Sequence, residues 1–355
     1  MRNPKLMLAA TAVSLAVAAV PSGTQAQIGL DPRLSVHGYL TQGVARASKP
    51  LYGLTDTTTS DYRAAAVQLS FEVSPKDRLV LQVSHRRLAS SPLMGFQENL
   101  EFDWAFYQRQ LGPISVRVGR FPLAGGIYNE VRDVGTVLPM FRAPFQLYAD
   151  GTETVDGVTA SHNLVFGDWS LESSAYWGGT EYKNVFQTPA GAYPQMFRFE
   201  NSVGGQLWLS TPLQGLRVAL SAMRWKHGEE PDHTVMASVD GDFNRFLVRG
   251  EYKTGSMDDA HLSFGYAQLG VKVTEKLMVV GQYESTDMTL SGAIAAPRMT
   301  VSRDAALALN YKLSPNLVFK LEQHEVKGYW YDTFVNPMGP ALKSRYGIAS
   351  VSVSF

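Results

Sequence analysis

Alternation of apolar and polar side chains is the feature that most constrains the fold of this chain. Segment after segment of about ten residues places apolar side chains at every second position, a spacing that gives a strand two different faces. Within residues 63–73, for example, Val67 and Leu69 fall on one face, whereas Gln68 and Ser70 fall on the other. The tight turn "SPKD" follows, and alternation then resumes. The pattern predicts a chain built almost entirely of strands.

The connections between these segments alternate between short turns and long polar loops. Short turns are expected at "SPKD", "LGP", "VFGD", "TPLQG", "GDFN", "TEK" and "SPN". Longer connections are expected near residues 45–61, 89–98, 178–197, 227–233, 287–300 and 328–344. This asymmetry is typical of transmembrane outer-membrane barrels, and the segments number about sixteen, an even number as in other bacterial barrels. A water-soluble sandwich or propeller is the alternative all-β fold, but it explains the asymmetry poorly.

The beginning of the chain reads as an export signal. Arg2 and Lys5 precede an apolar run over residues 6–20, and small residues end at Ala26. This order predicts a signal peptide over residues 1–26 and one antiparallel β-barrel domain over residues 27–355. Beyond the signal, no apolar run has the length of a membrane helix, so a mature protein that spans a membrane would do so as a closed barrel.

The composition narrows the classes of function. The sequence contains no cysteine, which excludes disulfides, iron–sulfur clusters held by cysteine and thiol nucleophiles. The formal net charge is zero, which gives no support for nucleic-acid binding. The sequence contains neither an HExxH zinc motif nor a GxSxG serine motif, and "HGEEPDH" at residues 227–233 reads as a solvated loop. We therefore assign no catalytic residue, no metal and no cofactor.

One long segment interrupts the strands. "GRFPLAGGIYNEVRDVGTVLPMFRAPFQLYADGTE" runs from residue 119 to residue 153 and is rich in glycine, proline and charged residues of both signs. A stretch of this length without regular structure is usually functional or disordered. The end of the chain has a different character, because "SRYGIASVSVSF" alternates strictly and finishes with the aromatic Phe355.

These two stretches carry a resemblance to a known family. The strand ending in Phe355 resembles the C-terminal signal through which bacterial outer-membrane proteins reach their insertion machinery. The whole mature chain resembles the sixteen-stranded porins of Gram-negative bacteria, most specifically at "GRF", "YNEVRDV" and the later Pro139, Pro144 and Tyr148. The chain lacks the "PEFGG" loop motif of the best-known general porins.

The resemblance implies both a structure and a function. In porins the loop after the fifth strand folds into the lumen and narrows it, which here implies a constriction loop over about residues 122–152. The protein would be a homotrimer in the outer-membrane lipid of a bacterial cell, and small hydrophilic solutes and ions would diffuse passively through it. A solute-specific channel with a binding site at the constriction is the main alternative, and an outer-membrane hydrolase is a more distant one. Cation or anion preference stays open.

Charged residues at the constriction would set its selectivity. The loop candidates are Glu130, Arg132, Asp133, Arg142 and Asp150, and local pairing that holds the loop's shape is an equally good interpretation of some of them. Strand alternation turns Arg86 and Arg117 toward the loop. The same alternation turns further residues inward, namely Asp103, Arg109, Arg217, Arg249 and Lys320. Aromatic residues expected at the membrane boundary are Trp104, Tyr252, Tyr283, Tyr311 and Phe355.

Overall fold

A computed structural model describes most of the chain. It covers residues 31–91, 100–148, 153–188, 191–226, 231–257, 260–290, 298–329 and 341–355. The expected signal peptide over residues 1–26 lies outside the described residues and stays a prediction. Within these ranges no helix is long and apolar enough to cross a membrane.

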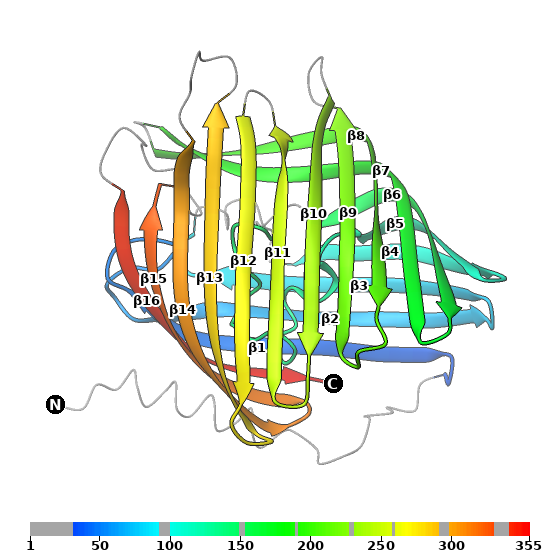
Figure 1. Cartoon of the computed structure of the whole chain (residues 1–355), viewed down its shortest axis with the longest axis horizontal. Helices are drawn as coiled ribbons and strands as arrows, with labels where there is room; N and C mark the ends of the chain where they lie inside the picture. Colours follow the sequence, from blue (N-terminus) through cyan, green and yellow to red (C-terminus); the bar gives the residue numbers. More distant parts are fainter. Residues whose placement is uncertain are drawn as a thin grey trace.

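Sixteen antiparallel strands form one closed barrel (Figure 1). Each strand pairs with its neighbours in sequence, and β1 pairs with β16 to close the ring. The expected fold class and strand number are therefore confirmed. The strands are β1 (Leu34–Ala47), β2 (Thr59–Ser74), β3 (Asp77–Leu88), β4 (Glu101–Leu111), β5 (Ile114–Pro122), β6 (Thr154–Phe166), β7 (Trp169–Thr188), β8 (Gly191–Ser210), β9 (Leu216–Lys226), β10 (Pro231–Asp242), β11 (Phe246–Met257), β12 (Ala260–Lys272), β13 (Leu277–Leu290), β14 (Met299–Ser314), β15 (Leu317–Gly328) and β16 (Leu342–Ser354).

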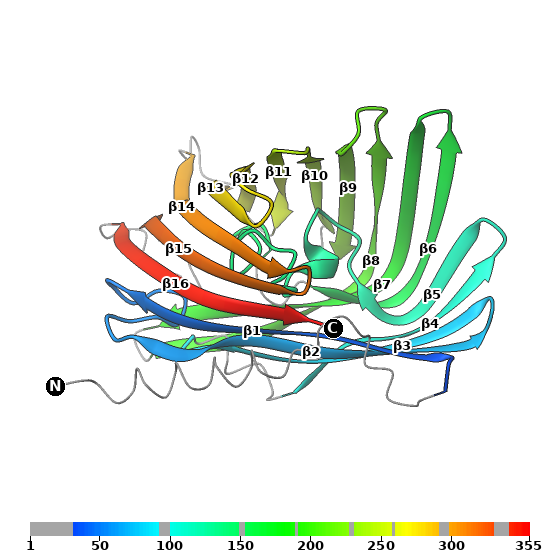
Figure 2. The same ribbon diagram turned by 90° about the horizontal axis from the view of Figure 1, so that it is seen from below.

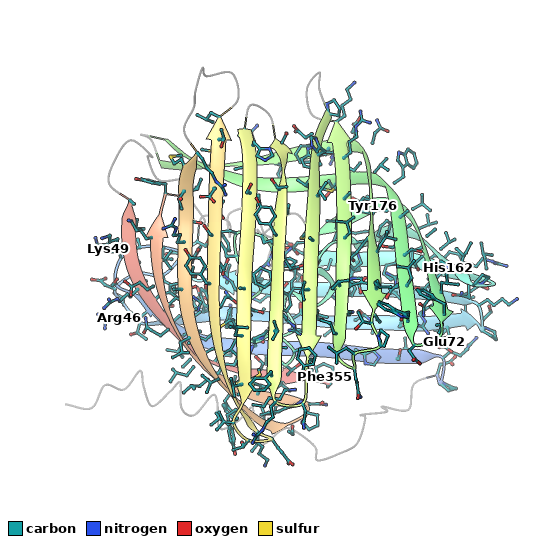
Figure 3. The ribbon with its side chains drawn as sticks, viewed as in Figure 1. Arg46, Lys49, Glu72, His162, Tyr176 and Phe355 are labelled. Atoms are coloured by element: carbon teal, nitrogen blue, oxygen red, sulfur yellow. The ribbon has the colours of Figure 1, made fainter. Side chains whose placement is uncertain are left out.

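Alternation separates an apolar outer face from a mixed inner face. Val67 and Leu69 of β2 are exposed on the outside, whereas Tyr62 and Ala64 are buried inside the ring. An apolar outer band is what the hydrocarbon of a bilayer requires of a barrel. Figure 3 shows Arg46 and Lys49 at one end of β1, the end with long connections, and Glu72 and Phe355 toward the end with short turns.

The lengths of the connections agree with the expected asymmetry, with one exception. Short turns join β2 to β3, β4 to β5 and β6 to β7 at one rim of the barrel. The long connection expected at residues 178–197 is wrong, because most of it is strand. β7 and β8 continue as a paired ribbon up to Thr188 and Gly191, well past the ends of β6 and β9.

A bulge in β4 makes two further expectations wrong, those for the directions of Trp104 and Arg109. Gln82 of β3 pairs with Trp104, but the next residue, Val83, pairs with Phe102, so Asp103 is an extra residue in the ladder. An extra residue reverses the facing of every side chain that follows. Trp104 therefore turns into the lumen rather than toward the membrane boundary. Arg109 lies on the outer face at the short-turn rim, where it pairs with Asp77, rather than inside the barrel.

Inside the barrel, an apolar cluster joins β3 to β7 beneath the start of the long segment after β5. Its core is Val80, Phe106, Phe121, Val155 and Tyr176. Phe121 ends the regular part of β5 and is 1% exposed. The cluster fixes the direction in which the chain leaves β5.

We expect Phe121→Ala to lower the free energy of unfolding by about 3 kcal/mol, because truncating a buried aromatic side chain loses contacts and leaves a cavity. Urea unfolding of the refolded protein in lipid vesicles measures the change. Phe102→Ala is the matched control, since Phe102 lies on the outer face and its removal opens no internal cavity. Equal losses in the two variants would contradict a packed cluster at Phe121.

Candidate functional site

The described part of the connection between β5 and β6, residues 123–148 and 153, lies inside the ring of strands (Figure 2). The connection runs over residues 123–153, one residue later than expected at each end, and Asp150 lies outside its described part. Its two ends are held side by side, because the amide of Leu123 donates to the carbonyl of Glu153 at 2.9 Å. The Asn129 side chain donates to the same two residues' carbonyls, at 2.8 and 3.0 Å. Asn129 begins a single 3-10 turn, Asn129–Val131.

Polar side chains of the far wall bind the backbone of this segment. Lys320 of β15 donates to the Met140 carbonyl at 2.7 Å, and Asn310 of β14 donates to the Pro139 carbonyl at 2.8 Å. Gln206 of β8 donates to the Gly126 carbonyl at 3.2 Å. A backbone carbonyl away from regular structure needs such a partner when it is buried. The wall therefore supplies the hydrogen bonds that the segment lacks within itself.

Two tyrosines of the segment join the same wall through hydroxyl groups. Tyr148 donates to Glu251 of β11 and accepts the amide of Tyr128 at 3.0 Å. Tyr128 donates to Gln268 of β12 and accepts from Arg249 at 3.0 Å. Burial raises the pKa of both tyrosine hydroxyls, so they remain protonated donors.

Apolar packing completes the attachment on the side of the long connections. Phe141 and Phe145 lie in a buried cluster with Tyr52 and Tyr62. Arg142 stacks over two rings of this cluster, at 4.5 Å from the Tyr52 centroid and 4.2 Å from the Phe145 centroid. A guanidinium placed over an aromatic ring is attracted to it by a cation–π interaction. Arg142 thus anchors the segment as well as lining a small pocket beside it.

The near wall meets the segment through charges instead. Arg86 of β3 lies 2.9 Å from Glu153 and 3.6 Å from Asp133, and Arg132 lies 3.7 Å from Glu153. Arg132 also donates to the Tyr148 carbonyl. These four side chains, which we call the charged bridge, join β3 to both ends of the segment. Their side chains are between 7 and 21% exposed, so the interactions are screened less than those of surface pairs.

A second, more open contact lies beside the charged bridge. Arg117 of β5 approaches Glu130 at 3.8 Å and donates to Gln108 at 3.1 Å. The Glu130 side chain is 64% exposed, so this pair faces water in the lumen. An exposed pair of this kind contributes little to stability. The Glu130 carboxylate remains accessible from the lumen.

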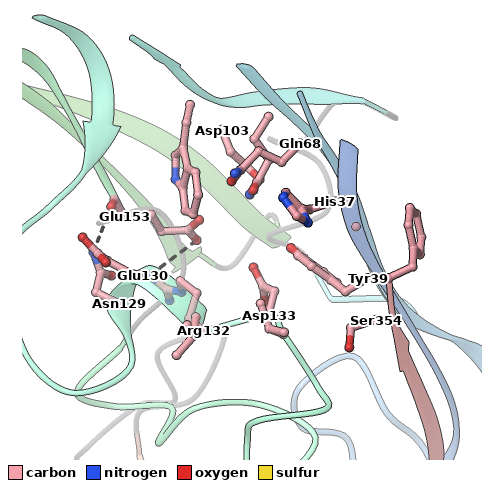
Figure 4. Close-up of a pocket in the computed structure, with 17 residues that line it drawn as sticks. His37, Tyr39, Gln68, Asp103, Asn129, Glu130, Arg132, Asp133, Glu153 and Ser354 are labelled. Atoms are coloured by element: carbon pink, nitrogen blue, oxygen red, sulfur yellow. Dashed lines mark hydrogen bonds and ion pairs between the residues drawn. The ribbon is translucent and has the colours of Figure 1, made fainter. Parts of the chain in front are cut away.

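A cavity of about 290 Å³ lies between the segment and the wall made by β1 to β4 (Figure 4). Four carboxylates line it, from Asp103, Glu130, Asp133 and Glu153, against one guanidinium, from Arg132. The wall also contributes His37, Gln68, Gln82 and Trp104. The cavity reaches Ser354 and Phe355, which places its lower end at the short-turn rim.

The charged bridge also lines two smaller spaces. Pockets of about 20 and 10 Å³ lie on the side of the long connections, and both are lined by Arg86 and Asp133. Asp133 lines all three spaces. The Arg86–Asp133 contact is therefore where the described residues bring the near wall and the segment together along this line of cavities.

The structure brings together most of the residues predicted from sequence. Arg86, Arg132 and Asp133 meet in the charged bridge, Arg117 meets Glu130, and Arg142 lies above them in the aromatic cluster. Arg217, Arg249 and Lys320 face inward as expected. Asp103 faces inward as expected and accepts hydrogen bonds from Gln82 and Ser84 at the bulge. One residue of the site escaped the sequence analysis, because Glu153 falls one residue beyond the expected loop end.

His324 is the most buried histidine among the described residues with a ring hydrogen bond, and its ring bears on the hydrolase alternative. One ring nitrogen lies 3.0 Å from Asp304 and the other lies 3.4 Å from Glu322. A serine nucleophile needs one of these nitrogens as its base. With a carboxylate at each nitrogen, the ring is held in the wall rather than directed at a serine.

The comparisons with known proteins bear on the fold. No protein-family model and no curated protein matches the sequence. OmpF of Salmonella typhi, in complex with daunomycin, matches with a TM-score of 0.64 at 11% identity, over 91% of this chain and 97% of that one. An anion-selective porin from Comamonas acidovorans matches with a TM-score of 0.58 at 11% identity, over 91% and 99%. The trimer form of OmpT, an outer-membrane protein of Vibrio cholerae, also matches with a TM-score of 0.58 at 11% identity, over 91% of this chain and 99% of that one.

The chain has the fold of an outer-membrane porin. The closed sixteen-stranded barrel superimposes on these outer-membrane neighbours over nine tenths of its length. At such low identity the likeness concerns the fold, and the charges of the site are this chain's own.

We expect Tyr148→Phe to lower the free energy of unfolding by about 1–3 kcal/mol, because it leaves the buried Glu251 carboxylate and the Tyr128 amide without a shared partner. The urea midpoint in lipid vesicles measures the loss. Tyr252→Phe provides the control, since the Tyr252 side chain lies exposed on the outer face of β11. An unchanged midpoint for Tyr148→Phe would argue against this attachment of the segment.

Proposed function

We propose that this protein is an outer-membrane porin through which small hydrophilic solutes and ions diffuse passively. The observation that carries the proposal is the segment folded into the lumen, which leaves a carboxylate-lined cavity against the wall of β1 to β4. A solute would pass between the segment and this wall, at the charged bridge. The protein needs no cofactor for this function and is not an enzyme.

The proposed channel prefers cations. Four carboxylates and one guanidinium line the cavity, and selectivity follows the local field at the narrowest part of a pore rather than the net charge of the protein. Arg86 adds a second positive charge at the upper end, yet the excess stays negative. Low-dielectric walls strengthen this field.

A solute-specific channel is the second candidate, and the wall of the cavity favours it. Trp104 offers an aromatic ring, while Gln68, Gln82 and His37 offer donors and acceptors beside it. This combination of one apolar surface with a few convergent polar groups is typical of sites for small ligands. A polar solute would then bind in the cavity before it crosses the charged bridge.

The assembly belongs to the same proposal. One of the structural neighbours is a trimer form, and we propose a homotrimer in the outer membrane whose subunits meet through their outward apolar faces. Insertion would use β16 and Phe355 as the signal read by the insertion machinery. Phe355 is 60% exposed on the outside of the barrel, where such a machinery could reach it.

Glu130→Gln combined with Asp133→Asn should shift the reversal potential toward anions, because it removes two of the four carboxylates of the cavity. Single-channel recording in a planar bilayer under a salt gradient measures the shift. Arg86→Gln should shift the potential in the opposite direction. Glu325→Gln removes an exposed carboxylate on the outer face of β15, outside the lumen, and serves as the control. An unchanged reversal potential in the double variant would contradict the proposal that ions pass beside these two carboxylates.

Trp104→Ala separates the two candidate channels. If the cavity binds a specific solute, current block by small sugars or organic cations saturates, and the variant raises the half-saturation concentration about tenfold, as expected when a stacking surface is lost. Noise analysis of the current during titration gives this concentration. A block that never saturates in the parent protein leaves the general porin as the better description.

A further inference from the structure

Three cations stand side by side on the outer face of the barrel. The register pairs Arg303 of β14 with Lys327 of β15, and Lys327 with Lys343 of β16. All three side chains are exposed, and the residues next to them in each strand face the lumen. We call these three residues the cation row. Side chains directly opposite one another on a sheet lie about 5 Å apart, and like charges at that spacing are destabilising.

Among the described residues no ion pair joins the cation row to a carboxylate. Glu325, the outward residue next to Lys327 in β15, pairs with Arg345 at 3.3 Å. The next strand, β1, adds another exposed cation, Arg46, which also has no ion pair among the described residues. Four other arginines at the same rim are paired: Arg87 with Asp61, Arg120 with Asp156, Arg198 with Glu181 and Arg298 with Asp287.

The cation row lies just beyond the apolar band. Outward residues of β14 from Ala305 to Leu313 are apolar or aromatic, and at about 3.3 Å per residue with a tilt of about 40° they cover roughly 20 Å of height. Arg303 is the next outward residue toward the long connections. This position corresponds to the headgroup level of the leaflet on the side of the long connections, which is the external side in barrels of this kind.

We propose that the cation row binds the phosphate groups of anionic lipids in the external leaflet. One phosphate-bearing headgroup accepts hydrogen bonds from several cations at once, and its charge removes the repulsion within the row. Each Lys or Arg near an anionic membrane surface adds to the attraction. The inference goes beyond the proposed channel, because it concerns the outer face of the barrel and not the lumen.

A second copy of the chain is the less suitable occupant. It would need an acidic patch to face the row, and the carboxylates Asp61, Asp156, Glu181 and Asp287 at this rim are each held by an arginine. The lipid supplies an anion without breaking any of these pairs. Charge complementarity therefore favours the lipid.

The test compares two triple variants of the full-length refolded protein. Arg303→Gln with Lys327→Gln and Lys343→Gln removes the cation row. Arg87→Gln with Arg120→Gln and Arg198→Gln removes three paired cations at the same rim and is the matched control. Native mass spectrometry in non-ionic detergent measures the dissociation constant for lipid A with both phosphates and for the same lipid with none. A heat-dependent gel shift checks that each variant is folded.

We expect loss of the cation row to weaken binding of the phosphorylated lipid by a factor on the order of 100, from three lost charges near an anionic surface. The control should bind within a few-fold of the parent, and Lys327→Arg with Lys343→Arg should keep the affinity. Affinity should fall as salt is added. Channel conductance, recorded on the same preparations, should stay at the parent value, which separates this inference from the proposed function.

Three results would overturn the inference. The first is parental affinity in the variant that lacks the row, and the second is equal binding of the lipid without phosphates. The third is displacement of the lipid by millimolar inorganic phosphate, which would make the row a site for the free ion. A changed ratio of trimer to monomer with unchanged lipid affinity would equally reject the lipid and assign the row to contact between copies.

Discussion

Closure of the sheet is the constraint on which the rest of this molecule depends. In a bilayer every backbone amide and carbonyl of the spanning segments needs a partner within the protein, and pairing of β1 with β16 provides the last of them. The amides and carbonyls of Gly38 and Phe355 exchange two hydrogen bonds of 3.0 Å at the end of that pair. Once the ring is closed, each strand has one face toward lipid and one toward the lumen. Alternate residues along a strand therefore face the lipid and the lumen in turn.

The inward side chains of the strands hold the segment that fills the lumen. The segment after β5 is not a strand, so its backbone must find partners on the inner wall, and Lys320, Asn310 and Gln206 provide them. These neutral or backbone-directed contacts lie on the side of β8 to β15. On the other side the segment meets the wall through ion pairs, where Arg86 faces Asp133 and Glu153. Hydrogen bonds and packing on one side and ion pairs on the other leave the cavity beside β1 to β4.

The strict pattern of the sequence was enough to predict the strand number, the closed barrel and the inward turn of Arg86, Arg117 and Lys320. Local irregularities escaped the same reasoning. The bulge at Asp103 has no composition signal, and it turned Trp104 inward and Arg109 outward. The extension of β7 and β8 as a ribbon was missed because residues 178–197 carry glycines and prolines, which are typical of loops. Glu153 was missed because the loop was expected to end at residue 152, whereas β6 begins only at Thr154. The cation row depends on register, which no single strand reveals.

The attachment of the segment has a consequence for engineering the barrel. Pro122 and Thr154, which flank the segment, are partners in the β5–β6 ladder. A tight hairpin turn could therefore join the two strands directly, since antiparallel partners need only about two residues between them. Such a shortened chain would keep all sixteen strands and lose the side chains that fill the lumen. The same scaffold would then serve as a wide, water-filled nanopore once the apolar side chains of its inner wall, such as Val80 and Phe106, are replaced by polar ones.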